Sequence, residues 1–557
     1  MSRSSHSWIG APRWTAALGP GIAFLLLWLV GYPLLLTLWE ALGGGTTLEY
    51  FKMFAERDDD WAALGRSLWI SVASVVLAGA VGIPLAFVFE RTDFPGRRVL
   101  GALMALPVAL PPLVGVIAFL FLYGESGIIT GLLRLAFRLD EAPWRLVGPG
   151  AILLVHTYSM YVYFYLFVRA ALTRLDGSMI EAAASLGAGR LRILRKVILP
   201  QLRPALLGAA LLTFMTSLGS FSAPYIFGGG YRVMTTQIVA SKISGLPALA
   251  QAEAVVLAVM ALLALVVIRR FQGEDAVTSA HGVAPERKKI VSPWARFGFA
   301  ALGWSLAIFM LLPHLTLILI SFVPIGTWTT QLLPPVLSTV NYQELFSQPE
   351  RLRPMINSLW MATVATFGAV ALGFVAARQS VTRGGRLGGA IEGLVALPWA
   401  IPGTVFALAL ATTFSVNSPA FLRFLWVGTP VILPLAYLVR CLPITGRSAL
   451  AGLRQLDPAL EEAAAGLGAS RPRRLIKVVL PLVRPALMAG LGLSFITALG
   501  DFVTSIILYT FTTRPISIEI ASALRVQEFG IAAAYGVLLM LISAVAFLIW
   551  GRGEASR

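Results

Sequence analysis

Long stretches free of charged side chains recur along the whole chain. A helix needs about 20 mostly apolar residues to cross the roughly 30 Å hydrocarbon core of a bilayer. Twelve stretches approach or exceed this length: residues 14–39, 67–89, 99–124, 146–168, 204–231, 247–268, 297–323, 354–377, 393–422, 424–439, 485–513 and 529–551. Glu253 interrupts the sixth near its start, and Arg440 cuts the tenth short. The pattern predicts an all-α polytopic membrane protein with about twelve transmembrane helices.

The chain divides into two halves that repeat each other. A polar connector, residues 273–296, separates a first half (1–272) from a second half (297–557). The motif ALPVALP at 105–111 matches ALPWAIP at 396–402 with an offset of 291, whereas residues 181–206 match 462–487 with an offset of 281. The first half therefore has ten extra residues between its third and fourth spans. Two parallel six-helix repeats predict a pseudo-two-fold axis along the membrane normal and a solute path between the halves.

Composition supports a membrane protein and excludes several kinds of site. The 557 residues are 57% hydrophobic and 13% charged, whereas soluble domains are about 45–50% apolar and about 25% charged. A single cysteine, Cys441, excludes a disulfide framework or a CxxC site. The four histidines, at positions 6, 156, 281 and 314, are too far apart to form a zinc motif. We therefore expect no cofactor bound by this chain and assign no metal ligands firmly, although the scarcity of histidine and cysteine does not exclude a metal as the solute.

The net charge of +17 follows the predicted topology. With the N-terminus inside, the cytoplasmic segments hold 31 of the 44 Lys and Arg residues but only 12 of the 27 Asp and Glu residues. Cytoplasmic loops are rich in Lys and Arg, so both termini are predicted to be cytoplasmic. The basic excess points to membrane lipids rather than nucleic acid as a partner.

A duplicated cytoplasmic segment carries the clearest motif. The first copy runs from Glu181 to Pro200 and the second from Glu462 to Pro481. Each copy predicts a short Ala-rich helix, a left-handed glycine at 187 or 468 that ends it, and a basic helix. Proline at 200 and at 481 is expected to end that second helix before the next span.

This segment resembles the EAA loop of ABC importer permeases, in which Glu-Ala-Ala is followed by a Gly and later by Leu-Pro. Both copies keep the Glu-to-Gly spacing of six and the Glu-to-Pro spacing of nineteen. The resemblance implies a type I ABC importer permease fold in a bacterial inner membrane. The alternative is a basic amphipathic linker on the inner leaflet.

In this family the loop is a coupling helix that docks on a cytoplasmic ATPase. The resemblance thus implies two copies of an ABC ATPase and a periplasmic or lipid-anchored solute-binding protein as partners. The implied coupling residues are Glu181, Ala182, Ala183, Gly187, Pro200, Glu462, Ala463, Ala464, Gly468 and Pro481. A phosphate-binding P-loop needs a Gly-Lys pair, and none of the six lysines follows a glycine. The chain is thus expected to be a translocation subunit and not an enzyme, with ATP used by its partner.

Fused permeases of this kind resemble the group that serves ferric iron, thiamine, aminoethylphosphonate and polyamines. Residues 223–245 and 505–539 look most like the ferric-iron branch, which makes iron the expected solute and the other three its alternatives.

Polar groups inside a membrane are costly and are candidates for a solute path. Asp501 lies in an otherwise uncharged stretch, and its counterpart in the first half is Ser220. Asp501 either faces the path and favours a cationic solute, or bonds neighbouring helix ends. Tyr158, Tyr161 and Tyr165 share one helical face and either contact the solute or pack within the bundle.

Two acidic features and two other protein classes remain. Glu253 is expected to mark the outer end of the sixth span, and the run at 56–60 is either a solvated loop or part of the surface for the binding protein. An ion-coupled secondary carrier also uses duplicated halves, but it predicts more buried acids than the one clear case, Asp501. An intramembrane enzyme needs a clustered nucleophile and base, which Cys441 and the scattered histidines do not provide.

Overall fold

The computed structural model describes residues 13–44, 48–105, 107, 111–272, 288–289, 292–328 and 331–550. Most of the predicted connector at 273–296 and four residues of the ALPVALP copy at 105–111 lie outside the described residues.

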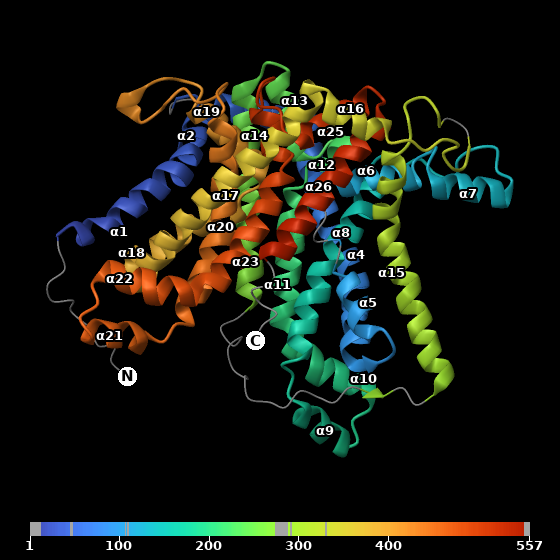
Figure 1. The fold of residues 1–557 in the computed structure, drawn as a ribbon, viewed down its shortest axis with the longest axis horizontal. Coiled ribbons are helices and arrows are strands. Elements are labelled where there is room, and N and C mark those ends of the chain that lie inside the picture. The colour runs from blue at the N-terminus through green and yellow to red at the C-terminus, as the bar shows by residue number, and fades with distance from the viewer. Residues whose placement is uncertain are drawn as a thin grey trace. The chain divides into compact units, whose positions relative to one another are not determined.

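The described chain is almost entirely helical (Figure 1). In the first half the elements are α1 Arg13–Leu26, η1 Leu27–Gly31, α2 Tyr32–Ala41, α3 Glu49–Glu56, α4 Asp58–Arg91, α5 Arg97–Leu103, α6 Pro112–Tyr123, α7 Ile128–Phe137, α8 Pro149–Leu172, α9 Gly177–Ser185, α10 Arg190–Ile193, η3 Leu194–Ile198, α11 Leu199–Leu218, α12 Ser222–Phe227, α13 Met234–Ile243 and α14 Pro247–Gln272. Two short strands, β1 Thr92–Asp93 and β2 Lys288–Lys289, pair in parallel.

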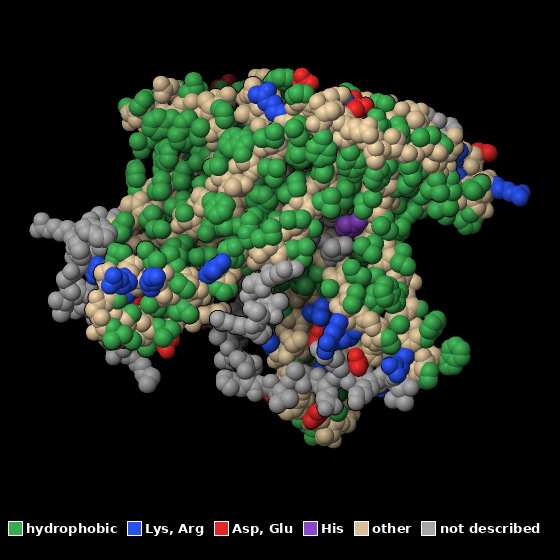
Figure 2. Space-filling model, in the orientation of Figure 1, with side chains coloured by type: hydrophobic (Ala, Val, Ile, Leu, Met, Phe, Trp, Pro, Cys, Tyr) green, Lys and Arg blue, Asp and Glu red, His purple; other side chains and the backbone are tan. Residues whose placement is uncertain are grey.

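The second half repeats much of this order. Its elements are α15 Pro293–Ser321, α16 Val340–Ser347, α17 Pro349–Arg383, α18 Gly385–Ala400, α19 Gly403–Thr413, η5 Pro419–Phe421, α20 Ile432–Arg454, α21 Pro458–Gly466, α22 Arg471–Arg474, η6 Leu475–Val479, α23 Leu480–Leu499, α24 Val503–Leu508, α25 Ile516–Arg525 and α26 Phe529–Trp550. The all-α class is therefore confirmed. Hydrophobic side chains cover most of the face seen in Figure 2.

The number of spans is smaller than the predicted twelve. Within the described residues, ten helices are long and apolar enough to cross a membrane, or eleven if α18 and α19, bent by 109° at their junction, count as one broken span. The tenth predicted span, the stretch 424–439, is not among these helices. Its predicted bounds are wrong, because the helix in this region is α20, which begins at Ile432 and ends at Arg454. This helix continues past Arg440 and also contains Arg447 and Arg454, so it is long but less apolar than the others.

Three other predicted spans end early or break. The third is split into α5 and α6. The fifth and eleventh stop where α11 and α23 end, and the short helices α12 and α24 follow. Proline and glycine can break a helix but carry no charge, so they do not interrupt an uncharged stretch. A search for uncharged stretches therefore cannot detect these breaks.

The described chain forms two compact units. Unit 1 comprises Met1–Glu40, Ile356–Arg514 and Ile542–Arg557, and unit 2 comprises Ala41–Met355 and Pro515–Leu541. Each half gives its first helix to the other half's unit. In unit 1 the indole of Trp28 donates a 3.1 Å hydrogen bond to the Leu422 carbonyl, and in unit 2 α15 packs on α5 and α6.

The centre of unit 2 is the close pair α4 and α8 (Figure 1). Gly82 makes this approach possible, because a Cβ at this position would overlap the carbonyl oxygen of Tyr161. Gly65 in the same helix is exposed and has no atom within 4 Å of an added Cβ. Comparing alanine substitutions at Gly82 and at Gly65 therefore distinguishes the effect of an added methyl group on helix packing from its effect on helix propensity.

We expect Gly82→Ala to force α4 away from α8 and to destabilise unit 2 by about 1–3 kcal/mol, the usual cost of overpacking. The matched Gly65→Ala should be neutral or stabilising by up to about 1 kcal/mol, since alanine favours a helix. Thermal unfolding of the detergent-purified protein measures both. Equal unfolding temperatures for the two variants would show that the α4–α8 contact is not tight.

Candidate functional site

The first EAA loop is a short capped helix with a glycine turn. Helix α9 begins after Asp176, whose carboxylate accepts a 3.0 Å hydrogen bond from the Ser178 amide. At its other end Gly187 adopts a φ of 78°, and the Ala188 amide donates to the Ala183 carbonyl at 3.0 Å. This closure needs a left-handed residue, which glycine adopts without strain. The predicted helix-ending role of Gly187 is confirmed.

The second loop reproduces the first bond for bond. Asp457 accepts from the Ala459 amide at 2.9 Å and starts α21. Gly468 has a φ of 77°, and the Ala469 amide donates to the Ala464 carbonyl at 3.0 Å. Each unit thus presents the same motif, held by the same local forces.

The prolines at 200 and 481 do not end the basic helix as predicted. In the first loop α10, the π-helical turn η3 and α11 follow each other without a gap, with Pro200 in the first turn of α11. The Leu199 amide donates to the Leu194 carbonyl five residues earlier. A π-turn inserts one extra residue into the helix, which allows the chain to pass a proline that has no amide hydrogen. Pro481 follows η6 in the same way.

The exposed surface of each EAA helix combines a glutamate with small alanines. Glu181 and Ala182 are exposed and Ala183 is half-buried, and Glu462, Ala463 and Ala464 repeat this pattern. The leucine before each glycine is almost fully exposed, at 88% for Leu186 and 90% for Leu467. Sequence reasoning missed these leucines, although both copies contain Leu-Gly at this point. Such exposure on a small-residue surface suits contact with a partner.

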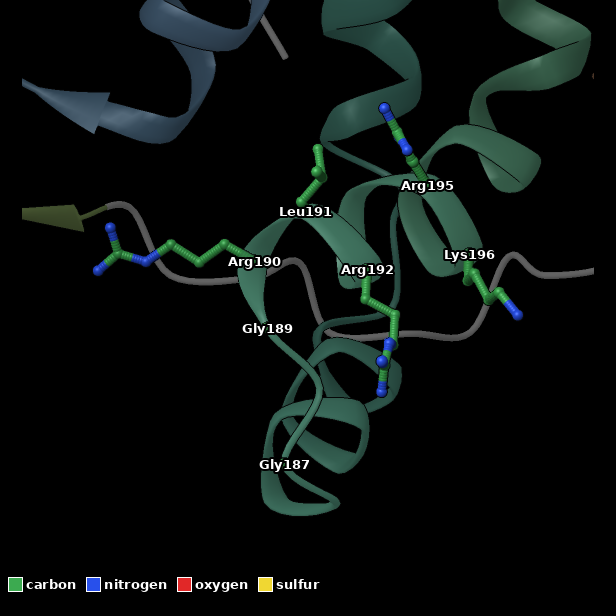
Figure 3. Close-up of a pocket in the computed structure, with 7 residues that line it drawn as sticks. All are labelled: Gly187, Gly189, Arg190, Leu191, Arg192, Arg195 and Lys196. Carbon is green, nitrogen blue, oxygen red and sulfur yellow. The ribbon is translucent and has the colours of Figure 1, made fainter.

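A groove of about 570 Å³ follows the first loop (Figure 3). Its lining is Gly187, Gly189, Arg190, Leu191, Arg192, Arg195 and Lys196. Figure 3 shows Arg195 and Arg192 pointing in opposite directions, with Arg190 and Lys196 directed away to either side. The four cationic side chains do not converge on one point, so the groove is a broad basic surface and not a clamp for a single anion.

The three tyrosines of α8 lie inside unit 2 with their hydroxyls in use. Tyr158 donates to the Met310 carbonyl at 2.8 Å, Tyr161 to the Met104 carbonyl at 2.7 Å, and Tyr165 to the Gly101 carbonyl at 2.9 Å. All three side chains are buried. A phenol whose proton is donated to a backbone carbonyl joins helices together, so these contacts favour the packing interpretation.

Asp501 lies at the start of α24 with an arginine as its partner. The Arg440 Nε atom is 3.1 Å from Asp501 Oδ2, and the Thr504 amide donates to Asp501 Oδ1 at 2.8 Å. The Arg440 side chain is 28% exposed but that of Asp501 only 3%. A Cβ on Gly403, the first residue of α19, would overlap the Arg440 guanidinium. The bond to α24 and the ion pair correspond to the second interpretation of Asp501, a residue that ties helix ends together.

Ser220, the first-half counterpart of Asp501, belongs to an uncharged network. Its hydroxyl is 2.9 Å from His156 Nε2, and His156 Nδ1 is 2.9 Å from the Ser74 hydroxyl and 3.1 Å from that of Ser217. Sequence reasoning considered His156 only as one of four scattered histidines. The offset of 281 places Tyr437 at its equivalent position, and the Tyr437 hydroxyl is 2.7 Å from that of Ser505.

More acidic side chains are buried than the single case expected. Asp60, Glu90 and Glu253 join Asp501 among the buried residues. Glu90 lies 3.4 Å from Arg169 and 3.9 Å from Arg97. The solvated-loop interpretation of residues 56–60 is therefore wrong for Asp60, since this residue sits in the first turn of α4 with its side chain inside. Charge spacing alone cannot distinguish a first helical turn that is packed from one that is solvated.

Comparison with known proteins matches both halves to one family. The profile described as the binding-protein-dependent transport system inner membrane component matches residues 78–273 and 369–552. One match in each half confirms the predicted duplication.

Relatives match along most of the chain. A probable ABC transporter permease, y4fN of Sinorhizobium fredii, is 31% identical over 502 residues, covering 89% of this chain and 88% of the relative. The ferric transport system permease FbpB of Actinobacillus pleuropneumoniae is 27% identical over 511 residues, covering 87% and 70%. The molybdenum transport permease ModB of Escherichia coli is 35% identical over 174 residues, covering 30% and 72%.

We expect Gly403→Ala to displace the Arg440 side chain and to weaken its ion pair with Asp501. Removing one partner of a buried ion pair costs roughly 3–5 kcal/mol of stability. Because Arg440 is partly exposed, we expect Gly403→Ala to cost no more than the lower end of this range. In an Asp501→Asn background the same change should cost less, with a coupling of about 0.5–3 kcal/mol for residues in contact. Thermal unfolding of the four proteins of this cycle gives the coupling.

Gly393→Ala is the matched control, since an added Cβ in α18 meets no atom within 4 Å. If Gly403→Ala costs the same in both backgrounds, the glycine does not act through the ion pair.

Proposed function

Because the chain belongs to the family of inner-membrane components of binding-protein-dependent transport systems, we propose that it imports a ferric solute with energy from two partner ATPases. The chain itself is a multi-pass permease of an ABC importer and a translocation subunit, not an enzyme. A solute-binding protein on the outer face delivers the cargo, and the two EAA loops transmit ATPase closure to the helices. Both termini face the cytoplasm of a bacterial cell.

The observation that carries this proposal is the pair of loops with matching geometry. Each loop is a capped helix ending in a left-handed glycine and an exposed leucine. Each also continues through a π-turn into a membrane-spanning helix, α11 or α23. The basic helix that follows the glycine turn is continuous with that span, so a force on this basic helix acts directly on the membrane-spanning helix. Two such loops suit two copies of one ATPase, and the excess of Lys and Arg in these segments supports a cytoplasmic location.

Replacing Gly187 and Gly468 together with valine should abolish co-purification of the ATPase. Their positive φ values are strained for a β-branched residue, although nothing occupies the space a side chain would enter. Gly189→Val is the matched control, because Gly189 has an open side-chain position and a φ of −66°. Leu186→Asp with Leu467→Asp should also release the ATPase without changing the loop backbone. Retention of the ATPase by all of these variants would exclude the loops as the docking site.

Iron is the proposed solute because ferric transport relatives align with most of this chain. Thiamine, polyamines and phosphonates are the alternatives from the same group. Two observations favour an oxyanion instead. Molybdenum and sulfate permeases match about 30% of the chain, and Arg440, not Asp501, is the more exposed member of the intramembrane ion pair.

Reconstitution with the purified ATPase and the co-purifying binding protein tests the solute. We expect ⁵⁵Fe(III) bound to that protein to raise ATP hydrolysis several-fold and to accumulate in proteoliposomes only when ATP is present. Accumulation of radioactive molybdate or sulfate but not of iron would favour the oxyanion. Transport that persists without any ATPase would overturn the importer mechanism in favour of an ion-coupled carrier.

A further inference from the structure

Two buried carboxyl groups meet at one end of unit 2, where α4, α13 and α14 come together. Asp60 is in the first turn of α4 and Glu253 in the second turn of α14, and neither side chain has any exposed surface. Gln237 and Ser241 of α13, also buried, lie against them. The solute path and the coupling loops described above do not include any of these four residues.

Each carboxyl group has one oxygen with a clear donor. The Gln237 amide donates to Asp60 Oδ1 at 2.8 Å, and the Ser241 hydroxyl donates to Glu253 Oε1 at 2.6 Å. Arg57 Nε lies 3.2 Å from Asp60 Oδ2. Asp60 therefore has an arginine and a side-chain amide beside it.

In the described part of the chain, the other oxygen of each carboxyl group is buried and lacks a hydrogen bond. Gln237 and Ser241 are one turn apart on α13, so they hold the two carboxyl groups as neighbours. Within the described residues, neither Asp60 Oδ2 nor Glu253 Oε2 has a hydrogen-bond partner, although Asp60 Oδ2 forms an ion pair with Arg57 Nε. Two ionised carboxylates in contact repel each other, and one guanidinium offsets only one of the two charges. An uncompensated charge in such a site costs several kcal/mol, on the order that makes buried groups change protonation state instead.

We propose that Asp60 and Glu253 hold one proton between them, carried by Glu253 Oε2 and donated to Asp60 Oδ2. This single proton supplies the missing donor, satisfies both oxygens and makes the cluster of Arg57, Asp60 and Glu253 electrically neutral. The site is thus a proton-binding site that fastens α14 to α4 and α13.

Helix α13 connects this site to Ser220. The Met234 amide donates to the Ser67 hydroxyl of α4 at 2.7 Å, and the Thr235 hydroxyl donates to the Ser220 carbonyl at 2.7 Å. Loss of the proton would loosen the contact of Gln237 with Asp60. Because Thr235, two residues earlier in α13, bonds to Ser220, the change in α13 would be transmitted to Ser220. Other charged side chains on the surrounding helices, Glu49, Lys52, Glu56, Asp58 and Asp59, are exposed, and Lys242 is half-buried.

Infrared difference spectroscopy of the detergent-purified protein tests the assignment. At neutral pH the wild type should show the carbonyl stretch of a protonated carboxylic acid, shifted in heavy water. Glu253→Gln should remove this band but preserve the unfolding temperature, since the new amide can donate to Asp60 and accept from Ser241. Asp60→Asn should also remove it, because Glu253 then ionises beside Arg57.

Glu90→Gln is the matched control. Glu90 is also buried but lies near two arginines and, among the described residues, not beside a second carboxyl group, so its replacement should leave the band unchanged. Raising the pH of the wild type should remove the band and lower the unfolding temperature, whereas Glu253→Gln should lose this pH sensitivity. A wild type without the band would overturn the proposal. So would a rise in its unfolding temperature with Na⁺ that is absent in Glu253→Gln, since the site would then bind a metal cation.

Discussion

The hydrocarbon core of a membrane offers no hydrogen-bond partner, so every polar group placed there must find one inside the protein. The helices of this chain follow from that constraint, as do the places where they depart from regularity. Pro200 and Pro481 interrupt the regular ladder at the start of α11 and α23, and a π-turn precedes each proline so that the helix continues. The basic helix of each EAA loop and the spanning helix that follows it are consequently continuous in each unit.

The same constraint determines which charges can be buried. Arg440 sits within α20 because Asp501 and Thr504 contact it and because Gly403 leaves room for its guanidinium. The equivalent region of the first half uses neutral groups, with His156 between three serine hydroxyls. A duplicated chain with both copies fused can accumulate such differences, since each half is specified separately. The intramembrane electrostatics of the two halves are therefore unequal although their folds are alike.

Local features of the sequence predicted what local forces determine. The spacing around Gly187 and Gly468 identified two helix ends, because a left-handed glycine closes a helix with bonds to its own last turn. The alignment of the two halves could also be predicted from the sequence. Interactions between residues far apart in the sequence could not be predicted. Arg440 was taken as the end of a span because Asp501 lies 61 residues further on, and Asp60 was assigned to a loop because Glu253 lies 193 residues away.

In the first half the Asp60–Glu253 site connects the start of α4 to α14. The second half connects the corresponding helices, α17 and α26, by a different interaction, which clarifies the role of the proton. The offset of 291 places Arg351 at the position of Asp60, at the start of α17. Its guanidinium pairs with both oxygens of Glu528, at 2.8 and 2.9 Å, immediately before α26. These hydrogen bonds hold the pKa of the Glu528 carboxyl below its ordinary value. An arginine–carboxylate pair is already neutral and needs no proton. The contact between α17 and α26 in the second half therefore does not depend on a proton. The corresponding contact between α4 and α14 in the first half depends on the proton at Glu253 and so responds to pH.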